Sequence, residues 1–369
     1  MSMSKFPAMS RPAIRSILPY EPGKPIAEVE REFGLTGVIK LASNENPLGS
    51  SPLALEAVRK ALTDTHRYPD GQGYYLKEKL SDKFEIPPNQ IVLGNGSTEL
   101  IELVTEAFVD EQDEVIIGRE EFFKYQIAVK IMNGRIVWAK MPELQYDVDE
   151  ILSVVTDATK VIFIANPNNP TGTLMDKIQV ERLLDHLPEQ IIVVFDEAYF
   201  EYRDHNHYPD TLSYIHNGRS IITLRTFSKS YGLAALRVGY AFSTVDICTA
   251  MNAVREAFNV NSLAQAAATA ALDDNAFLIE SIKHNLQNKR YFYGELDRLG
   301  VSYINTEANF ILMNTPIKGR ELFQSLLRRG VVVRPVDGYG LPDYIRVTIG
   351  LHSEIESFMR ELSKLLNDR

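Results

Sequence analysis

Short apolar runs alternate with amphipathic segments through the middle of the chain. Seven runs are rich in β-branched residues and apolar at successive positions, which predicts strands buried on both faces. They are residues 91–93, 115–117, 136–138, 161–164, 191–195, 221–224 and 238–242. Between them lie segments of helical spacing, such as the one with a broad apolar face that begins at Ser97. This pattern predicts an α/β fold with a seven-stranded, mostly parallel sheet covered by helices.

The pattern changes at both ends of the chain. Near the N-terminus we expect a turn-rich arm, a helix over 26–33, a strand over 38–42 and a helix begun by Ser51 and Pro52. In the C-terminal part we expect helices over 276–299 and 320–329, a final helix, and strands at 301–305, 309–313, 331–334 and 344–348. We therefore expect an arm (1–40) that packs with a smaller α+β domain (275–369), and a large domain (41–274).

The composition narrows the classes of function. Of 369 residues, 45% are hydrophobic and 24% charged, as in ordinary globular enzymes. The net charge of -10 argues against nucleic acid or an anionic membrane as the main partner, because both attract clustered lysine and arginine. The single cysteine, Cys248, lies in an apolar run, so we expect it in the core and the chain in the cytoplasm. His205 and His207 have no third ligand nearby, so we expect no metal site.

Four predicted strands are followed by polar groups, and ligands of doubly wound sheets bind at the carboxyl ends of strands. Residues 94–98 open a helix and fit either a plain tight turn or an anion site that uses the backbone of Gly96 and Ser97. Residues 165–172 contain two Asn-Pro pairs. They form either a rigid turn only or a turn that presents the Asn169 amide at the sheet edge.

The other two strand ends carry charged groups. Asp196 follows a fully apolar strand with no basic residue within five positions, so it either caps a local turn or meets a cationic ligand. Lys229 is either a surface lysine or an amine that forms a Schiff base. The second interpretation fits its neighbours, because Thr226, Ser228 and Arg237 are residue types that bind phosphate.

Together the four strand ends supply what pyridoxal phosphate requires. Lys229 would hold its aldehyde, and Asp196 would keep its ring nitrogen protonated. Asn169 and Tyr199 would donate to its phenolic oxygen, while residues 96–98 and 226–237 would cradle its phosphate. Lys229, once displaced by the substrate amine, would be free to move the proton of the substrate Cα.

Three motifs resemble the fold-type I pyridoxal-phosphate-dependent aminotransferases. They are Asn-Pro-Thr-Gly at 169–172, Asp-Glu-Ala-Tyr at 196–199, and Ser-Lys at 228–229 with Arg-Val-Gly at 237–239. Longer segments are similar to the histidinol-phosphate aminotransferases, namely 18–25, 41–47, 67–71, 225–239 and 344–350. The block around Lys229 is specific to that subgroup, and the resemblance runs from about residue 14 to the C-terminus.

The resemblance implies a homodimer that acts in histidine biosynthesis. Its reaction would convert L-histidinol phosphate and 2-oxoglutarate to imidazole acetol phosphate and glutamate. Lys229 would be the catalytic residue. The cofactor would be held by Asp196, Tyr199, Asn169, Gly96, Ser97, Phe122, Thr226, Ser228, Arg237 and, from the partner subunit, Tyr68. The substrate would contact Tyr20, Asn44, Arg334 and Arg346.

The alternation over 344–348 adds a structural reason for one of these assignments. Ile345 and Val347 should face the core, which turns Arg346 to the opposite face of its strand. A guanidinium matches both phosphate and carboxylate. One arginine could therefore grip either substrate of a two-step transamination. The alternative is a strand arginine in a surface ion pair.

One segment departs from the family. Members usually carry Pro-Thr before the aromatic residue that stacks on the cofactor ring, whereas Glu120 and Glu121 precede Phe122 here. The geometry of that loop is therefore open. Three other functions also stay open: an aromatic amino acid aminotransferase, a pyridoxal-phosphate lyase such as a threonine-phosphate decarboxylase, and an inactive binding protein. The intact Lys229 and Asp196 argue against the last of these.

Overall fold

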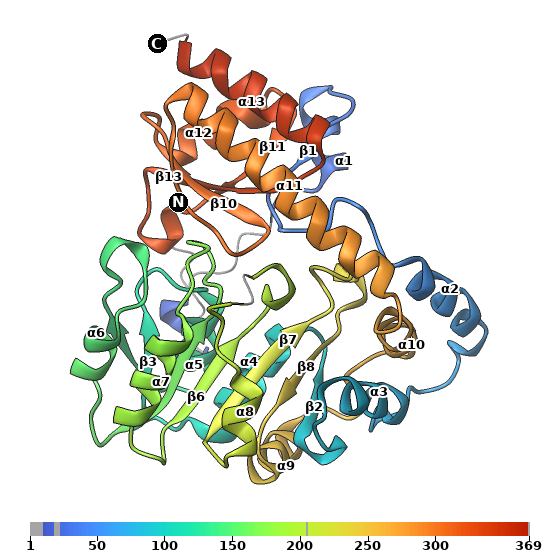
Figure 1. Ribbon diagram of the computed structural model, residues 1–369, viewed down its shortest axis with the longest axis vertical. Helices are drawn as coiled ribbons and strands as arrows, with labels where there is room; N and C mark the ends of the chain where they lie inside the picture. The colour runs from blue at the N-terminus through green and yellow to red at the C-terminus, as the bar shows by residue number, and fades with distance from the viewer. Residues whose placement is uncertain (1–9, 18–22, 204–205, 368–369) are drawn as a thin grey trace.

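The computed structural model describes residues 10–17, 23–203 and 206–367. Figure 1 shows a large sheet with helices around it and a smaller unit above. The α-helices are α1 (Ile26–Phe33), α2 (Pro52–Ala61), α3 (Tyr74–Phe84), α4 (Ser97–Phe108), α5 (Lys124–Ile131), α6 (Val148–Ser153), α7 (Lys177–His186), α8 (Thr211–His216), α9 (Val245–Val254), α10 (Ser262–Ala271), α11 (Asn275–Leu299), α12 (Gly319–Leu327) and α13 (His352–Asn367). Short 3-10 helices include η1 (Pro12–Ser16), η2 (Leu62–Asp64), η4 (Pro142–Leu144) and η7 (Asp337–Tyr339).

The strands form one large and two small sheets. They are β1 (Ile39–Lys40), β2 (Ile91–Gly94), β3 (Glu114–Gly118), β4 (Arg135–Ala139), β5 (Thr159–Ala165), β6 (Ile192–Asp196), β7 (Ile221–Thr226), β8 (Gly239–Phe242), β9 (Ser302–Ile304), β10 (Phe310–Asn314), β11 (Val331–Val332), β12 (Arg334–Pro335) and β13 (Tyr344–Thr348). The large sheet has the order β2-β8-β7-β6-β5-β3-β4. Only β8 runs antiparallel to its neighbours, so the predicted seven-stranded, mostly parallel sheet is confirmed.

Alternate residues of the large sheet enter two separate cores. On one face, residues such as Val92 and Val194 pack with α4, α5 and α9. On the other face, residues such as Leu93 and Phe195 pack with α3, α7, α8 and α10. The expectation that all seven strands are buried on both faces is wrong for the edge strand β4, where Trp138 is exposed. An edge strand has a neighbour on one side only, so part of it stays open to solvent.

The C-terminal part forms its own core. The sheet β12-β13-β10-β9 is antiparallel, and its residues Ile311, Met313 and Val347 pack with α11, α12 and α13. The predicted single strand over 331–334 is wrong, because β11 pairs with β1 while β12 turns to pair with β13. We propose the division into units 41–274 and 275–369 on the basis of these separate cores.

The N-terminal arm contacts both units. Val29 of α1 packs with Val38 of the arm itself and with Leu327 and Val332 of the small unit. The segment η1 lies instead against α5 of the large unit, where Arg11 Nη2 donates to the Ile131 carbonyl at 2.8 Å. That the arm over 1–40 belongs with the small unit therefore stays a proposal.

Two further expectations concern the core and the membrane. Cys248 is fully buried, and burial raises the pKa of its thiol to about 12, as suits a small core residue. Among the described residues, no helix combines the length and apolar character needed to cross a bilayer.

A tight contact joins the two units beside the 165–172 loop. Gly172 has a φ of +79°, and a Cβ there would lie 2.1 Å from Thr306 Oγ1 and 3.1 Å from Thr306 Cα. The backbone N–H of Glu307 donates to the Gly172 carbonyl at 2.8 Å. Only glycine permits both this backbone conformation and this approach.

We therefore expect Gly172→Ala to lower the free energy of unfolding by about 2–5 kcal/mol. The loss has two parts, because an alanine is strained in the left-handed conformation and its Cβ would overlap with Thr306. Gly218→Ala is the matched control, because Gly218 has a φ of +76° but nothing within 4 Å of an added Cβ. That variant should lose only the strain, about 1–2 kcal/mol. Denaturant unfolding of both variants measures the difference, and equal losses would contradict the proposed contact.

Candidate active site

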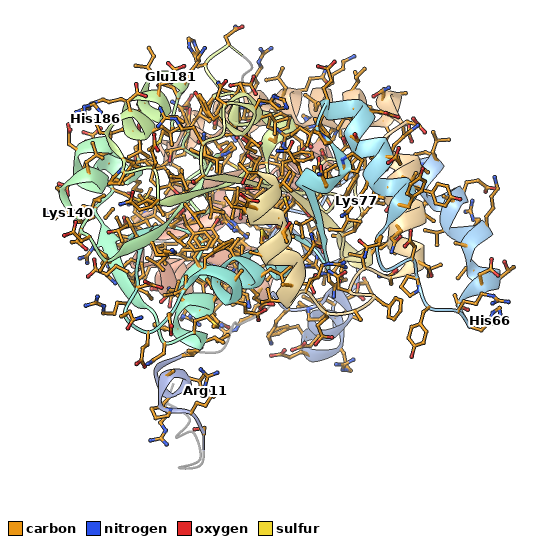
Figure 2. The ribbon with its side chains drawn as sticks, turned by 90° about the horizontal axis from the view of Figure 1, so that it is seen from below. Arg11, His66, Lys77, Lys140, Glu181 and His186 are labelled. Carbon is orange, nitrogen blue, oxygen red and sulfur yellow. The ribbon has the colours of Figure 1, made fainter. Side chains whose placement is uncertain are left out.

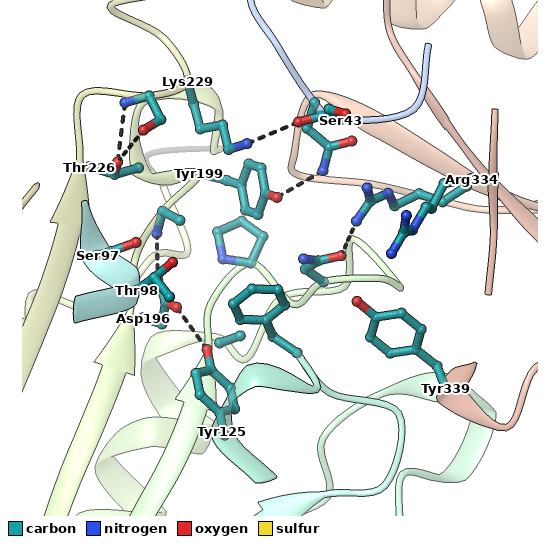
Figure 3. Close-up of a pocket in the computed structure, with 18 of the residues that line it drawn as sticks. Ser43, Ser97, Thr98, Tyr125, Asp196, Tyr199, Thr226, Lys229, Arg334 and Tyr339 are labelled. Carbon is teal, nitrogen blue, oxygen red and sulfur yellow. Dashed lines mark hydrogen bonds between the residues drawn. The ribbon is translucent and has the colours of Figure 1, made fainter. Parts of the chain in front are cut away.

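One pocket lies at the carboxyl ends of β5, β6 and β7, under the small unit (Figure 3). It is lined by Ser43, Asn44, Ser97, Thr98, Phe122, Tyr125, Ala165, Pro167, Asn169, Asp196, Ala198, Tyr199, Thr226, Ser228, Lys229, Arg237, Arg334, Tyr339 and Arg346. Twelve of the fifteen residues predicted from the sequence are among them. The pocket therefore unites strand ends that are far apart along the chain.

Lys229 lies in the loop that follows β7, and its side chain points into the pocket (Figure 3). Its Nζ donates to the carbonyl of Ser43 at 3.2 Å. Burial lowers the pKa of Lys229 to about 8, and the positive charge of Arg346 acts in the same direction. A substantial fraction of this amine is therefore neutral near pH 8, as a nucleophile requires.

Asp196 is the last residue of β6 and is 5% exposed. Tyr125 donates its O–H to Asp196 Oδ2 at 2.8 Å, and the N–H of Ala198 donates to Oδ1 at 3.2 Å. Burial raises the pKa of Asp196 to about 6, while these two donors oppose the shift. No ion pair to Asp196 occurs within the described ranges, so this carboxylate suits a cationic ligand.

Tyr199 and Asn169 approach the pocket from two different loops. The hydroxyl of Tyr199 accepts a hydrogen bond from Asn44 Nδ2 at 2.8 Å. Burial raises the pKa of Tyr199 to about 12, so the hydroxyl keeps its proton and can donate it to an oxygen. Asn169 Oδ1 accepts a hydrogen bond from Nη1 of Arg346.

The groups predicted to bind an anion also meet at this pocket. Gly96 precedes α4 with a φ of +77°, and no side chain caps the helix, so N–H groups at its first turn are available to an anion. A Cβ at Gly96 would lie 2.4 Å from Arg237 Nη2, so glycine makes room for that guanidinium. Thr226 Oγ1 donates to Ser228 Oγ at 3.0 Å, and both hydroxyls line the pocket with Ser97.

Two arginines enter the pocket from the small unit. Arg334 and Arg346 are directly opposite each other on β12 and β13, so both side chains project from the same face. Arg346 faces away from the core that contains Ile345 and Val347, as the alternation predicted. Its Nε is buried and has no hydrogen-bond partner in the described part of the chain. An anionic substrate group could supply that partner.

Three predicted site residues do not line this pocket. Gly96 only borders it through Arg237. Tyr68 is 84% exposed and stacks on Phe258, with 4.8 Å between ring centroids. Tyr20 falls outside the described residues.

The sequence interpretation missed several residues that the fold brings to the pocket. Tyr125, the hydrogen-bond partner of Asp196, sits on α5, where an aromatic residue reads as core. Tyr339 enters from η7, and its ring meets Phe123 edge to face at 5.9 Å. Ser43 also lines the pocket and had no signal in the sequence. Thr98 lines it as well, and it lies within the 96–98 segment that the sequence analysis singled out.

These residues fit pyridoxal phosphate on observations of this structure. The buried Asp196 has donors but no cation, which matches a protonated ring nitrogen. The Arg237 guanidinium that packs against Gly96, at the start of α4, matches a phosphate-binding group. Lys229 lines the same pocket as these two groups, so its amine is available to an aldehyde bound there.

The chain is similar to known proteins over almost all its length. Residues 36–362 match the family described as aminotransferase class I and II. A histidinol-phosphate aminotransferase from Moorella thermoacetica is 44% identical over 96% of this chain and 92% of its own length. Histidinol-phosphate aminotransferase 1 from Nitrosococcus oceani is 42% identical over 100% of both chains.

A similar solved structure belongs to the same group of enzymes as these sequence relatives. The histidinol-phosphate aminotransferase from Sinorhizobium meliloti, in complex with pyridoxal-5'-phosphate, superposes with a TM-score of 0.89, covers 100% of both chains and is 26% identical. Sequence relatives and fold agree on one group of enzymes. The chain therefore belongs to the class I and II aminotransferases and, within them, to the histidinol-phosphate aminotransferase family.

Proposed function

We propose that this chain is a pyridoxal-phosphate-dependent transaminase of histidine biosynthesis. It converts L-histidinol phosphate and 2-oxoglutarate to imidazole acetol phosphate and glutamate. The observation that carries this proposal is the position of Lys229 in one pocket with the unpaired carboxylate of Asp196 and an anion site at α4. The relatives that are 40–44% identical share the same name.

The residues of the pocket divide the work of the reaction. Bound pyridoxal phosphate supplies an electron sink that makes the Cα–H bond of the substrate labile. Lys229 would hold the cofactor and then carry the Cα proton, for which a pKa of about 8 is well placed. Asp196 would stabilise positive charge at the ring nitrogen, and Phe122 would pack against the ring. Tyr199 and Asn169 would bind the phenolic oxygen.

The anionic groups of both substrates bind the same two arginines, Arg334 and Arg346. Histidinol phosphate carries a phosphate and glutamate carries two carboxylates, and both must reach the same ring in turn. Arg334 and Arg346 present two guanidinium groups on one face, next to Asn44. A bidentate arginine accepts either anion. This pairing favours a donor that carries a strong anion over a neutral aromatic side chain.

A homodimer is the finer part of the proposal. Large apolar side chains are exposed on α2, η2, α3 and the two nearby loops: Leu53, Leu55, Leu62, Tyr68, Tyr74, Tyr75 and Phe258. Figure 1 shows α2 and α3 together at one side of the molecule. Apolar surface of this extent favours burial against a second copy. Tyr68 would then contact the cofactor phosphate of the partner subunit.

We also propose a cytoplasmic location, since the reaction is biosynthetic. A single buried cysteine is consistent with a reducing compartment.

Lys229→Ala should abolish covalent attachment of the cofactor while the chain stays folded. Borohydride reduction followed by mass spectrometry should detect the cofactor on the native chain and none on the variant. Lys77→Ala is the control, because Lys77 is also half-buried with a burial-lowered pKa but lies on α3 (labelled in Figure 2) and does not line the pocket. Attachment and turnover that survive in Lys229→Ala would contradict the assignment.

Arg346→Gln should slow both half-reactions by about thirty- to a thousandfold in kcat/KM, the loss of about 2–4 kcal/mol in charge-assisted contacts. Single-turnover spectroscopy with histidinol phosphate and with glutamate measures each step. The control is Arg360→Gln on α13, where the arginine side chain is 61% exposed. A loss with glutamate alone would assign the phosphate to Arg334, and a change of only a few fold in both would refute the role.

Mixing inactive Tyr68→Ala and Lys229→Ala chains should restore activity, because a mixed dimer has one intact site if Tyr68 acts across the interface. Random exchange gives about a quarter of the native activity. Mixing Asp196→Ala with Lys229→Ala is the control. Both residues belong to the same subunit's site, so that mixture should stay inactive. If verified exchange of the first pair restores nothing, Tyr68 does not act in trans.

A further inference from the structure

The loop between β3 and α5 contains a buried carboxylate that the reaction above does not use. Glu121 is 3% exposed, although it lies in the segment where two acids precede Phe122. Its Oε1 accepts from the Tyr146 hydroxyl at 2.5 Å and from the Ala165 N–H at 2.8 Å. Its Oε2 accepts from the Gly118 N–H at 2.7 Å. Three donors on one carboxylate favour its ionised form.

These bonds fix the loop that carries Phe122. Gly118 ends β3 and Ala165 ends β5, so one side chain ties the loop to two neighbouring strands at the edge of the pocket. A further bond, from Asn168 Nδ2 to the Glu120 carbonyl at 2.9 Å, joins the same two loops. Glu121 thereby gives the loop the rigidity that a proline would otherwise provide.

Glu121 also belongs to a buried acidic cluster with Asp196. Ala165, which donates to Glu121, is the register partner of Asp196, and Tyr125 donates to Asp196. The groups that face Glu121 are Tyr146 from the loop before α6, Tyr125 from α5 and Asp196 from β6. Burial raises the pKa of Glu121 to about 8 against the effect of its three donors, and the charge of Asp196 acts in the same direction as burial. A cation bound beside Asp196 would lower this pKa and so favour the ionised form of Glu121.

No ion pair reaches either Glu121 or Asp196 across the described segments. Two buried carboxylates without a cation cost free energy unless something compensates them. The cation that can do so is the protonated ring that Asp196 binds, and this step of the argument rests on the proposed function.

We propose that Glu121 is a positioning residue of the cofactor site. Its carboxylate holds the Phe122 loop in place and adds a second negative charge to that of Asp196, which stabilises the positively charged form of the bound cofactor. If Glu121 instead only stabilised the folded chain, its removal would leave the protonation of the cofactor unchanged.

Glu121→Gln in the holoenzyme separates these two roles, because glutamine keeps the shape and removes the charge. Loss of a nearby negative charge disfavours the cationic form of the cofactor. The pKa of the bound cofactor, measured from the pH dependence of its visible absorption, should therefore fall by about half a unit to one unit. The affinity of the apoenzyme for pyridoxal phosphate should fall about three- to tenfold. Glu120→Gln is the matched control and should change neither, since its carboxylate is outside the cluster.

Tyr146→Phe provides a second, independent variant if Glu121→Gln does not fold. It removes one donor to Glu121 but keeps the ring, so it should shift the absorption pKa in the same direction by a smaller amount. The double variant should shift it no further than Glu121→Gln alone.

An unchanged absorption pKa and cofactor affinity in the folded variants would overturn the proposal, even if their melting temperatures fall. Native protein that binds no cofactor would instead refute the proposed function, so the two failures are distinguishable.

Discussion

Parallel pairing of β5, β6 and β7 puts Ala165, Asp196 and Leu224 side by side, and the whole pocket depends on that alignment. Because all three strands run in one direction, their carboxyl ends meet at one edge of the sheet. The loops that leave this edge then carry Asn169, Tyr199 and Lys229 toward a common point. Slippage of one strand by a residue would turn its side chains to the opposite face and separate these groups.

The small unit completes what the sheet begins. Asn44 is central to this contact, because its backbone N–H donates to Thr348 Oγ1 at 2.9 Å and its carbonyl accepts from Asn309 Nδ2 at 3.1 Å. Its own amide reaches Tyr199. Three parts of the chain thus meet around Asn44: the N-terminal segment, a loop of the large sheet and the small sheet. The backbone of Asn44 has a φ of +55°. The residues proposed to bind the substrate and those proposed to bind the cofactor therefore come from different parts of the chain.

The sequence predicted the structure best where neighbouring residues alone determine it. Apolar runs followed by polar residues located the strand ends, and strict alternation placed Arg346 correctly. The pattern failed where a distant partner decides the outcome. Val331 to Arg334 read as one strand, but β1 pairs with its first half and β13 with its end. Tyr125 has no local mark of its bond to Asp196, and the role of Tyr68 requires a second chain.

The cross-strand pair Arg334 and Arg346 carries a thermodynamic consequence. Two like charges directly opposite each other on an antiparallel pair repel, so this pair carries an electrostatic cost within the small sheet. An anion bound between them, as the proposed function requires, would reduce that cost, so anion binding would be linked to folding as well as to catalysis. Under the proposed function, substrate binding would therefore raise the stability of the folded enzyme, and scarcity of substrate would lower it.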